Sequence, residues 1–198
     1  MKYFISDVHF SADETLKREN RPFKSARQYD KQVVRTWNKQ TKKGDTIFVI
    51  GDLIDCDNEN DCGWKKSINF VKKIKADVVL VLGNNEERVI KYFFGGDFEK
   101  FREFCLKLGY HDVLKNTKVE IAGKKFFLVH DPAKRRNNML NLFGHVHRAE
   151  GIYKPYGFNL SCDLNHFRLF SEEDISQLLK IKEAYWDKDL NPKNKKKN

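Results

Sequence analysis

The sequence predicts an α/β protein with a parallel sheet, because short buried strands alternate with helical patterns and carry polar residues at their ends. Apolar runs rich in β-branched and aromatic residues are typical of core strands. Strand, helix, strand order is the signature of a right-handed parallel unit. Five such runs occur, at 3 to 6, 47 to 50, 78 to 82, 126 to 129 and 139 to 143.

Helical patterns lie between and after these runs. The first helix is expected to begin at a capping pair, Ser25 and Gln28. The last is expected to open at a capping box formed by Ser171 and Asp174 and to continue to about residue 186. Apolar residues spaced three and four apart predict the remaining helices. These are expected at 64 to 75, 86 to 94 and 98 to 108.

The second half of the chain predicts shorter, hairpin-like strands. A turn at Ala122-Gly123-Lys124 divides the segment 119 to 129 into a hairpin, and 158 to 164 predicts a further strand. With no internal repeat and no linker, we expect one domain over 1 to 188. The lysines and asparagines after Pro192 have no apolar residue to anchor them, so a disordered tail is expected over 189 to 198.

The chain is basic, with a net charge of +10 that falls to +7 for residues 1 to 188. Such a charge suits an anionic substrate or a nucleic acid, but it can equally reflect genome composition. The four cysteines form no C-x-x-C pair, and nothing at the N-terminus resembles a signal peptide. No run approaches the ~20 apolar residues of a membrane span. We therefore expect a soluble, cytoplasmic protein with reduced thiols.

A candidate metal ligand follows every expected core strand. In an open α/β sheet the carboxyl ends of the strands face one crevice, so these ligands are expected to converge. Two further histidines, His9 and His147, share loops with the first and last of them. The five residues at the strand ends are Asp7, Asp52, Asn84, His130 and His145.

Carboxylate, imidazole and amide ligands suit manganese, iron, zinc, nickel or magnesium, and we expect manganese. Asp52 can bridge two ions ~3.5–4 Å apart, which would clamp the attacking and departing oxygens of a phosphoryl displacement. A lone D-x-H or G-H-x-H is weak evidence, because isolated histidines are more often packed or surface residues. The coincidence of all five segments, each directly after a strand, favours a site with two divalent ions.

Five short motifs together resemble the calcineurin-like metallophosphoesterase family. They are D-V-H at 7 to 9, G-D-L-I-D at 51 to 55, G-N-N-E at 83 to 86, V-H-D at 129 to 131 and G-H-V-H at 144 to 147. Two flanking segments, N-R-P-F at 20 to 23 and N-L-S-C-D-L at 159 to 164, resemble a small bacterial and phage subgroup of that family.

The resemblance implies a metallo-dependent phosphatase-like fold, a four-layer α/β/β/α sandwich. It also implies two ligand sets that share Asp52. One ion would be held by Asp7, His9, Asp52 and His147, and the other by Asp52, Asn84, His130 and His145. Asp55, the second aspartate of G-D-L-I-D, is expected to orient one of the metal ligands without binding an ion itself.

The sequence departs from the family pattern at Asn85. The resemblance places a histidine there as general acid, and an amide cannot supply a proton to the leaving oxygen. General acid catalysis is worth ~10²–10⁴ in rate, so poor leaving groups should be turned over slowly. His166 and His111 are candidate substitutes; of the two we favour His166, but an ordinary surface histidine is the better interpretation of both.

Arginines near the expected site are candidates for holding phosphate oxygens. Ordinary solvated arginines are the alternative. The candidates are Arg21, Arg135, Arg136 and Arg148.

The function predicted is hydrolysis of phosphate esters by a metal-bridging hydroxide, with phosphodiesters favoured because the site lacks an acid. The basic body could hold a nucleotide. One alternative is a metal-dependent nuclease, whose cleavage should fall steeply as salt rises. Another is a binding module that kept the fold and lost catalysis. The oligomeric state is left open.

Overall fold

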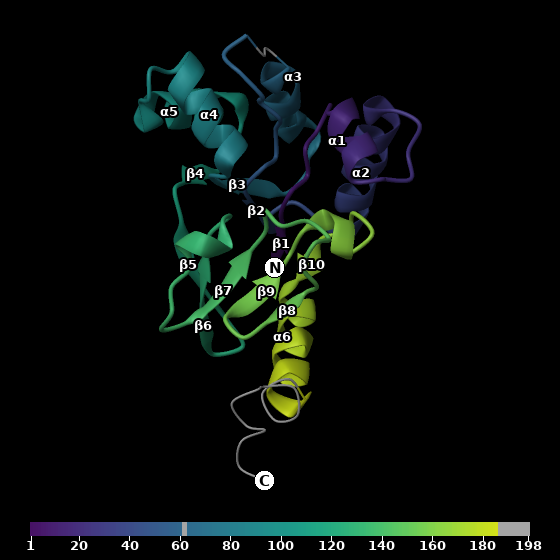
Figure 1. Ribbon diagram of the computed structural model, residues 1–198, viewed down its shortest axis with the longest axis vertical. Helices are drawn as coiled ribbons and strands as arrows, with labels where there is room; N and C mark the ends of the chain where they lie inside the picture. Colours follow the sequence, from purple (N-terminus) through teal and green to yellow (C-terminus); the bar gives the residue numbers. More distant parts are fainter. Residues whose placement is uncertain (61–62, 186–198) are drawn as a thin grey trace.

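The computed structural model describes residues 1–60 and 63–185 and contains two five-stranded sheets (Figure 1). The first sheet has the strand order β10-β1-β2-β3-β4. Its strands are β10 (Phe170–Ser171), β1 (Lys2–Ile5), β2 (Thr46–Ile50), β3 (Asp77–Val81) and β4 (Asp112–Leu114). The second sheet has the order β5-β6-β7-β9-β8. Its strands are β5 (Thr117–Ile121), β6 (Lys124–Leu128), β7 (Leu140–Phe143), β9 (Gly157–Asn159) and β8 (Tyr153–Lys154).

The interior strands of both sheets run parallel. In the first sheet β1 to β4 are parallel, and β10 is antiparallel at the edge. In the second sheet β6, β7 and β9 are parallel, with β5 and β8 antiparallel at the edges. A bridge between Ser6 and Ser161 joins the end of β1 to the segment after β9. The carboxyl ends of the two parallel sets are thereby held together.

Helices cover the outer face of the first sheet. They are α1 (Asp13–Arg18), α2 (Ala26–Gln40), α3 (Trp64–Ile68), α4 (Asn84–Phe93) and α5 (Phe98–Leu108). Figure 1 shows these helices together at one end of the molecule, with α6 (Glu172–Ile181) on the opposite side of the first sheet. α6 contacts β1, β5 and β10.

Alternate residues of the first sheet pack into two separate cores. In β1, Tyr3 and Ile5 face the helices, whereas Phe4 faces the second sheet. This alternation is the period of two expected for a strand, and it makes both faces of the sheet apolar. Phe126 and Phe158 fill the core between the sheets, and α6 adds Ile175 and Leu179 to it.

The predicted α/β sandwich class is confirmed, as are all five core strands to within two residues at each end. Both predicted helix starts are also confirmed. The Ser25 hydroxyl accepts the Gln28 N–H at 3.3 Å. Ser171 and Asp174 form a reciprocal box, in which each side chain accepts the backbone N–H of the other.

Two element predictions were wrong. The helix expected at 64 to 75 is the short α3 followed by a 3₁₀ turn, η1 (Asn69–Lys73). Ile68, Val71 and Ile74, which flank and occupy this turn, recur at the spacing of three that a 3₁₀ turn favours. The strand expected at 158 to 164 ends at Asn159. Beyond it the chain leaves the second sheet, because Cys162 donates its N–H to the Ser6 carbonyl.

The sequence patterns missed α1, β4, β8 and β10, which are too short to show a period. The tail predicted at 189 to 198 and the domain limit at 188 lie outside the described residues. Within 1–60 and 63–185, no helix is long and apolar enough to cross a membrane.

Phe126→Ala should lower the free energy of unfolding by about 3–5 kcal/mol, because the ring is fully buried between the sheets. Ile181→Ala is the control, since Ile181 is exposed and should change stability by less than about 0.5 kcal/mol. Urea unfolding measures both. Equal losses in the two variants would contradict the assignment of Phe126 to the core between the sheets.

Candidate metal centre

The strand ends bring together two groups of potential metal ligands. In each group the donor atoms lie within 4.8 Å of one another. One group comprises Asp7, His9 and His147, from the loops after β1 and β7. The other comprises Asp52, His130 and His145, from the loops after β2, β6 and β7.

Asp52 lies between the two groups. Its Oδ2 atom is 3.4 Å from His130 Nε2 in its own group and 3.8 Å from His9 Nε2 in the other. The Asn84 side-chain oxygen lies 3.2 Å from His130 Nε2 and 2.9 Å from His145 Nδ1, so it joins the second group. The structure therefore brings all seven predicted ligands to one place.

Two buried polar atoms at this place have no hydrogen-bond partner among the described residues. They are Asp7 Oδ2 and His9 Nε2, which belong to the same group. The other Asp7 oxygen accepts the His145 N–H at 2.8 Å. Leaving such atoms unpaired costs about 1–3 kcal/mol each. A carboxylate oxygen and an imidazole nitrogen left free side by side fit a divalent cation.

The backbone is strained at these ligands. Asp7, His9, Asp52, His145 and His147 all have positive φ, between 45° and 74°. Residues other than glycine rarely adopt this conformation, which costs of the order of 1–3 kcal/mol and persists only where the surroundings impose it. The strain is therefore concentrated in the segments that aim the ligands.

Glycines let these segments approach closely. A Cβ at Gly83 would overlap the Asp52 carboxylate and backbone, and one at Gly144 would overlap Ser6 and Asp7. Each glycine directly precedes a ligand, Asn84 or His145. The G-N and G-H pairs of the sequence are thus explained by close packing between loops.

Hydrogen bonds made by Nδ1, on the side of the ring away from the metal centre, orient two of the histidines. His9 Nδ1 donates to Asp55 Oδ1 at 2.5 Å, and the other Asp55 oxygen accepts the Thr15 hydroxyl at 2.8 Å. His130 Nδ1 donates to the Ile50 carbonyl at 2.9 Å. Both imidazoles are left with Nε2 facing the centre, the arrangement that metal-binding histidines commonly show.

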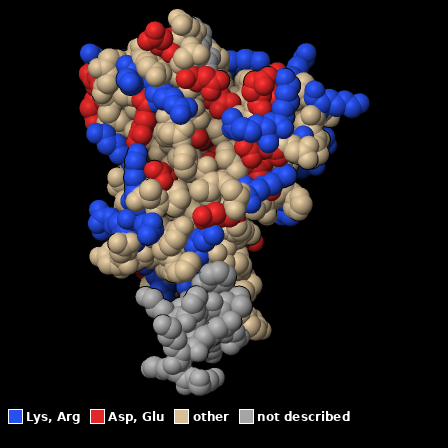
Figure 2. All heavy atoms as spheres, in the orientation of Figure 1, with Lys and Arg blue, Asp and Glu red and all other residues tan. Residues whose placement is uncertain are grey.

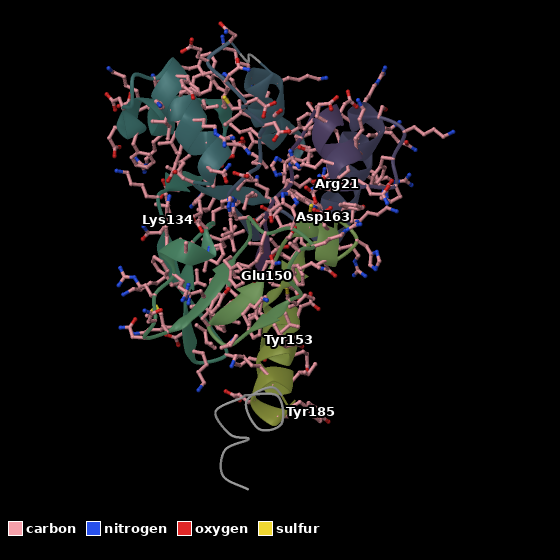
Figure 3. The ribbon with its side chains drawn as sticks, in the orientation of Figure 1. Arg21, Lys134, Glu150, Tyr153, Asp163 and Tyr185 are labelled. Atoms are coloured by element: carbon pink, nitrogen blue, oxygen red, sulfur yellow. The ribbon has the colours of Figure 1, made fainter. Side chains whose placement is uncertain are left out.

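A buried ion pair supports His147. Its Nδ1 atom donates to Asp163 Oδ2 at 2.8 Å. Arg21 holds the same carboxylate with two hydrogen bonds, Nε to Oδ1 at 2.8 Å and Nη2 to Oδ2 at 3.0 Å (Figure 3). Arg21 also donates to the backbone carbonyls of Asp7 and Val8.

The predicted role of Arg21 in binding substrate was therefore wrong. Its side chain is 0% exposed and lies behind the ligands, where it fixes Asp163 and the loop after β1. The arginine and its partner come from N-R-P-F and N-L-S-C-D-L, the two flanking segments singled out in the sequence.

Glu86 is a structural residue of the centre that the sequence analysis did not assign. Its buried carboxylate accepts the backbone N–H groups of Asp52, Leu53 and Gly83 at 2.8 to 3.0 Å. Burial raises its pKa to about 7. Its position, three residues after Gly83 at the start of α4, is the capping-box spacing and could have revealed it.

Opposite charges dominate the electrostatics at Asp52 and His130. Burial alone would raise the pKa of Asp52, but His130 and His9 outweigh it and hold that pKa below its usual range. Burial alone would lower the pKa of His130, but Asp52 and Asp7 raise it. A cation entering this field competes with the His130 proton.

The comparison with protein families agrees with this geometry. A family model described as calcineurin-like phosphoesterase matches residues 3–188. The chain belongs to the calcineurin-like phosphoesterase family. The uncharacterized protein MJ1445 of Methanocaldococcus jannaschii is 29% identical over 188 residues, covering 89% of this chain and 90% of that protein.

A solved structure shares the fold of this phosphoesterase. It is the protein of unknown function AQ665 from Aquifex aeolicus, with a TM-score of 0.62 and 22% identity. The match covers 90% of this chain and 98% of that one.

Asn85, at the position expected for a general acid, is bonded to the central carboxylate. Its Nδ2 atom donates to Asp52 Oδ2 at 2.9 Å, and its oxygen accepts from Arg88 at 3.1 Å and from the Cys56 N–H at 3.2 Å. In this phosphoesterase the amide therefore orients Asp52.

A hollow of about 280 Å³ opens over the centre, lined by the ligands His9, Asp52, Asn84, His145 and His147 and also by Arg18 and Arg88. Neither arginine was predicted. Arg88 lies one helical turn after Asn84, which was a usable signal. Arg18 belongs to α1, which the sequence patterns missed.

The other residues predicted to contact the substrate do not line this hollow. Arg135 lies over the Tyr156 ring at 4.6 Å, and Arg136 over the Phe127 ring at 4.7 Å. Arg148 and His166 are exposed, and neither lines the hollow.

Gly83→Ala should destabilise the protein by about 1–3 kcal/mol and weaken manganese binding at least tenfold, because the new methyl group displaces Asp52. Gly151→Ala is the matched control, since a Cβ there meets nothing within 4 Å. Thermal unfolding and calorimetric titration with Mn²⁺ measure the two effects. Normal Mn²⁺ affinity in Gly83→Ala would contradict the proposed packing against Asp52.

The Asp163 ion pair should make the metal-free protein sensitive to acid. Burial would raise the pKa of Asp163, but hydrogen bonds from His147 and Arg21 lower it to about 2. A lowered pKa stabilises the fold above the unfolded value of about 4, and this contribution is lost as pH falls through about 2.

Urea unfolding at a series of pH values from 5 to 2.5 measures this contribution. The wild type should lose up to about 2 kcal/mol more over this range than Asp163→Asn, which cannot titrate at this position. Identical pH slopes for the two proteins would show that Asp163 is not held ionised by its partners.

Proposed function

We propose that this phosphoesterase uses two divalent ions, manganese by preference, to hydrolyse phosphodiesters. The observation that carries the proposal is the position of Asp52, whose Oδ2 atom lies within 4 Å of a histidine in each ligand group. Iron, zinc, nickel and magnesium are the alternatives that this donor set allows. The cytoplasmic location expected from the sequence stays a prediction.

Two bound ions would lower the pKa of a water molecule and neutralise charge on the phosphoryl oxygens. The chain itself supplies the rest. Asp55, Asp163 and the Ile50 carbonyl hold His9, His147 and His130 in fixed orientations. Arg18 and Arg88 lie at the hollow and can hold the non-bridging phosphate oxygens.

The preference for phosphodiesters with good leaving groups follows from the missing acid. Asn85 carries no proton that it can transfer, and its amide is engaged with Asp52 and Arg88. The histidines that line the hollow, His9, His145 and His147, are all proposed metal ligands. His166 is exposed and outside the hollow, so it is not part of the proposal.

A nuclease is the second candidate, supported by a basic groove between α2 and η1. It is lined by Arg27, Lys31, Arg35, Lys66 and Lys73. An acidic hollow adjoins the hollow over the metal centre, sharing Asp55 and Asp57 with it, and is also lined by Asp13 and Glu14. Because these carboxylates would repel a nucleic-acid backbone that approached the centre along this side, we favour small phosphodiesters. The complete ligand set argues against a non-catalytic binding module.

Hydrolysis of bis-p-nitrophenyl phosphate tests the proposal. Turnover should require added Mn²⁺, Ni²⁺, Fe²⁺ or Zn²⁺, and Asp52→Asn should lower kcat/KM at least 100-fold by removing the shared ligand. Asp77→Asn, an exposed change at the start of β3, is the control and should be unaffected.

Absence of turnover with these four metals and with Mg²⁺ would overturn the proposed activity. Cleavage of DNA or RNA that falls steeply with salt would favour the nuclease instead. Activity on small esters that is insensitive to salt would exclude the nuclease.

A further inference from the structure

A second cavity, which we call the side cavity, adjoins the metal centre. It has a volume of about 510 Å³ and lies between α4, the start of α5 and the second sheet. Asn84 and His145 line both the side cavity and the hollow over the metal centre, so the two spaces are adjacent. Its volume falls in the range of roughly 300–1,000 Å³ typical of small-molecule sites.

Much of the side cavity is apolar. Leu82, Ile90 and Val129 contribute aliphatic surface, and Phe98 and Phe127 contribute two aromatic rings from α5 and β6. Phe127 is held in place, because it is 4% exposed and Arg136 lies over its ring. Phe98 is half-buried at the first turn of α5. Flat aromatic groups stack on such rings, and stacking contributes to the binding of nucleic-acid bases.

Cations also line the side cavity. Lys91 and Lys115 form no ion pair with a described carboxylate, and Lys115 Nζ lies 5.0 Å from the centre of the Phe98 ring. Lys134, labelled in Figure 3, differs, because its Nζ atom is paired with Glu87 at 3.0 Å. Lys91 Nζ lies instead 5.3 Å from the centre of the Tyr92 ring, which does not line the cavity. One ammonium group beside the Phe98 ring and a second at the cavity wall suit a ligand that is both flat and anionic.

We propose that the side cavity binds the nucleoside part of the substrate. The base packs against Phe98, and a second phosphate lies near Lys91 and Lys115, while the scissile phosphate occupies the metal centre. The substrate class is a nucleoside phosphodiester with a further phosphate, as in a short oligonucleotide. This inference rests on the proposed function, which it narrows from phosphodiesters in general.

The chemistry of the cavity favours this occupant over others. A sugar phosphate has no flat apolar group to place against Phe98. A neutral lipid chain would leave Lys91 and Lys115 without a counter-charge. A nucleotide offers an aromatic ring and anionic groups a few ångströms apart, which matches both features.

Binding to the metal-free protein tests the cavity independently of catalysis. Thymidine 3′,5′-bisphosphate, titrated by calorimetry, should bind at least tenfold more tightly than inorganic phosphate. Phe98→Leu, which keeps an apolar side chain but removes the ring, and Lys115→Gln should each weaken binding about tenfold. Lys118→Gln is the matched control, because Lys118 is exposed on β5 and does not line the cavity.

The side cavity would be ruled out as the nucleoside site if the bisphosphate bound no more tightly than phosphate. The same conclusion would follow if Phe98→Leu and Lys115→Gln both bound it like the wild type. An effect of Lys118→Gln equal to that of Lys115→Gln would show attraction by the general basic charge alone.

Two esters that release the same leaving group, p-nitrophenol, allow this inference and the proposed function to be tested separately. With Mn²⁺, kcat/KM for thymidine 5′-(p-nitrophenyl phosphate) should exceed that for methyl p-nitrophenyl phosphate at least tenfold. Phe98→Leu should reduce this advantage and leave the methyl ester unaffected. Equal kcat/KM values for the two esters would overturn the side cavity as the nucleoside site and leave the proposed function standing. Failure to hydrolyse either ester would overturn the proposed function. The binding titration alone would then decide whether the side cavity binds a nucleoside.

Discussion

The structure depends on one constraint: a carboxylate at the end of β2 must lie within 4 Å of imidazoles carried by the loops after β1 and β6, one from each sheet. Parallel strands in two sheets bring the loops to one edge, but they do not aim the side chains. Positive φ at five ligands does that, and the resulting strain requires support. Glu86 provides part of it by accepting three backbone N–H groups around Asp52, and the pair of Arg21 and Asp163 supports His147.

The same constraint separates what the sequence could predict from what it could not. Strand-end ligands were predictable, because parallel strands present their carboxyl ends at one edge whatever the side-chain details. Arg21 was not, because a motif gives no measure of burial, and the guanidinium expected at the substrate lies behind the ligands. The 3₁₀ turn of η1 escaped notice because apolar residues three apart also fit an α-helix. Arg18 was missed with its helix, which spans only six residues.

Charge is distributed in a way that the net value does not reveal. Figure 2 shows Lys and Arg side chains interspersed with carboxylates over one face of the molecule, with no single continuous basic surface. The basic side chains near the metal centre instead form two small groups. Arg18 and Arg88 line the hollow, and Lys91 and Lys115 line the side cavity. Local placement of this kind supports the small phosphodiester proposed above over a long polyanion, which would also meet the acidic residues beside the hollow.

The paired-ion arrangement around Asp52 is tested most directly by anomalous diffraction from a crystal of this protein grown with excess Mn²⁺. Two manganese peaks ~3.5–4 Å apart, with one Asp52 carboxylate between them, are the result that this account predicts. The first peak should be ligated by Asp7, His9 and His147, and the second by Asn84, His130 and His145. A single peak, or two peaks that do not share Asp52, would contradict the account.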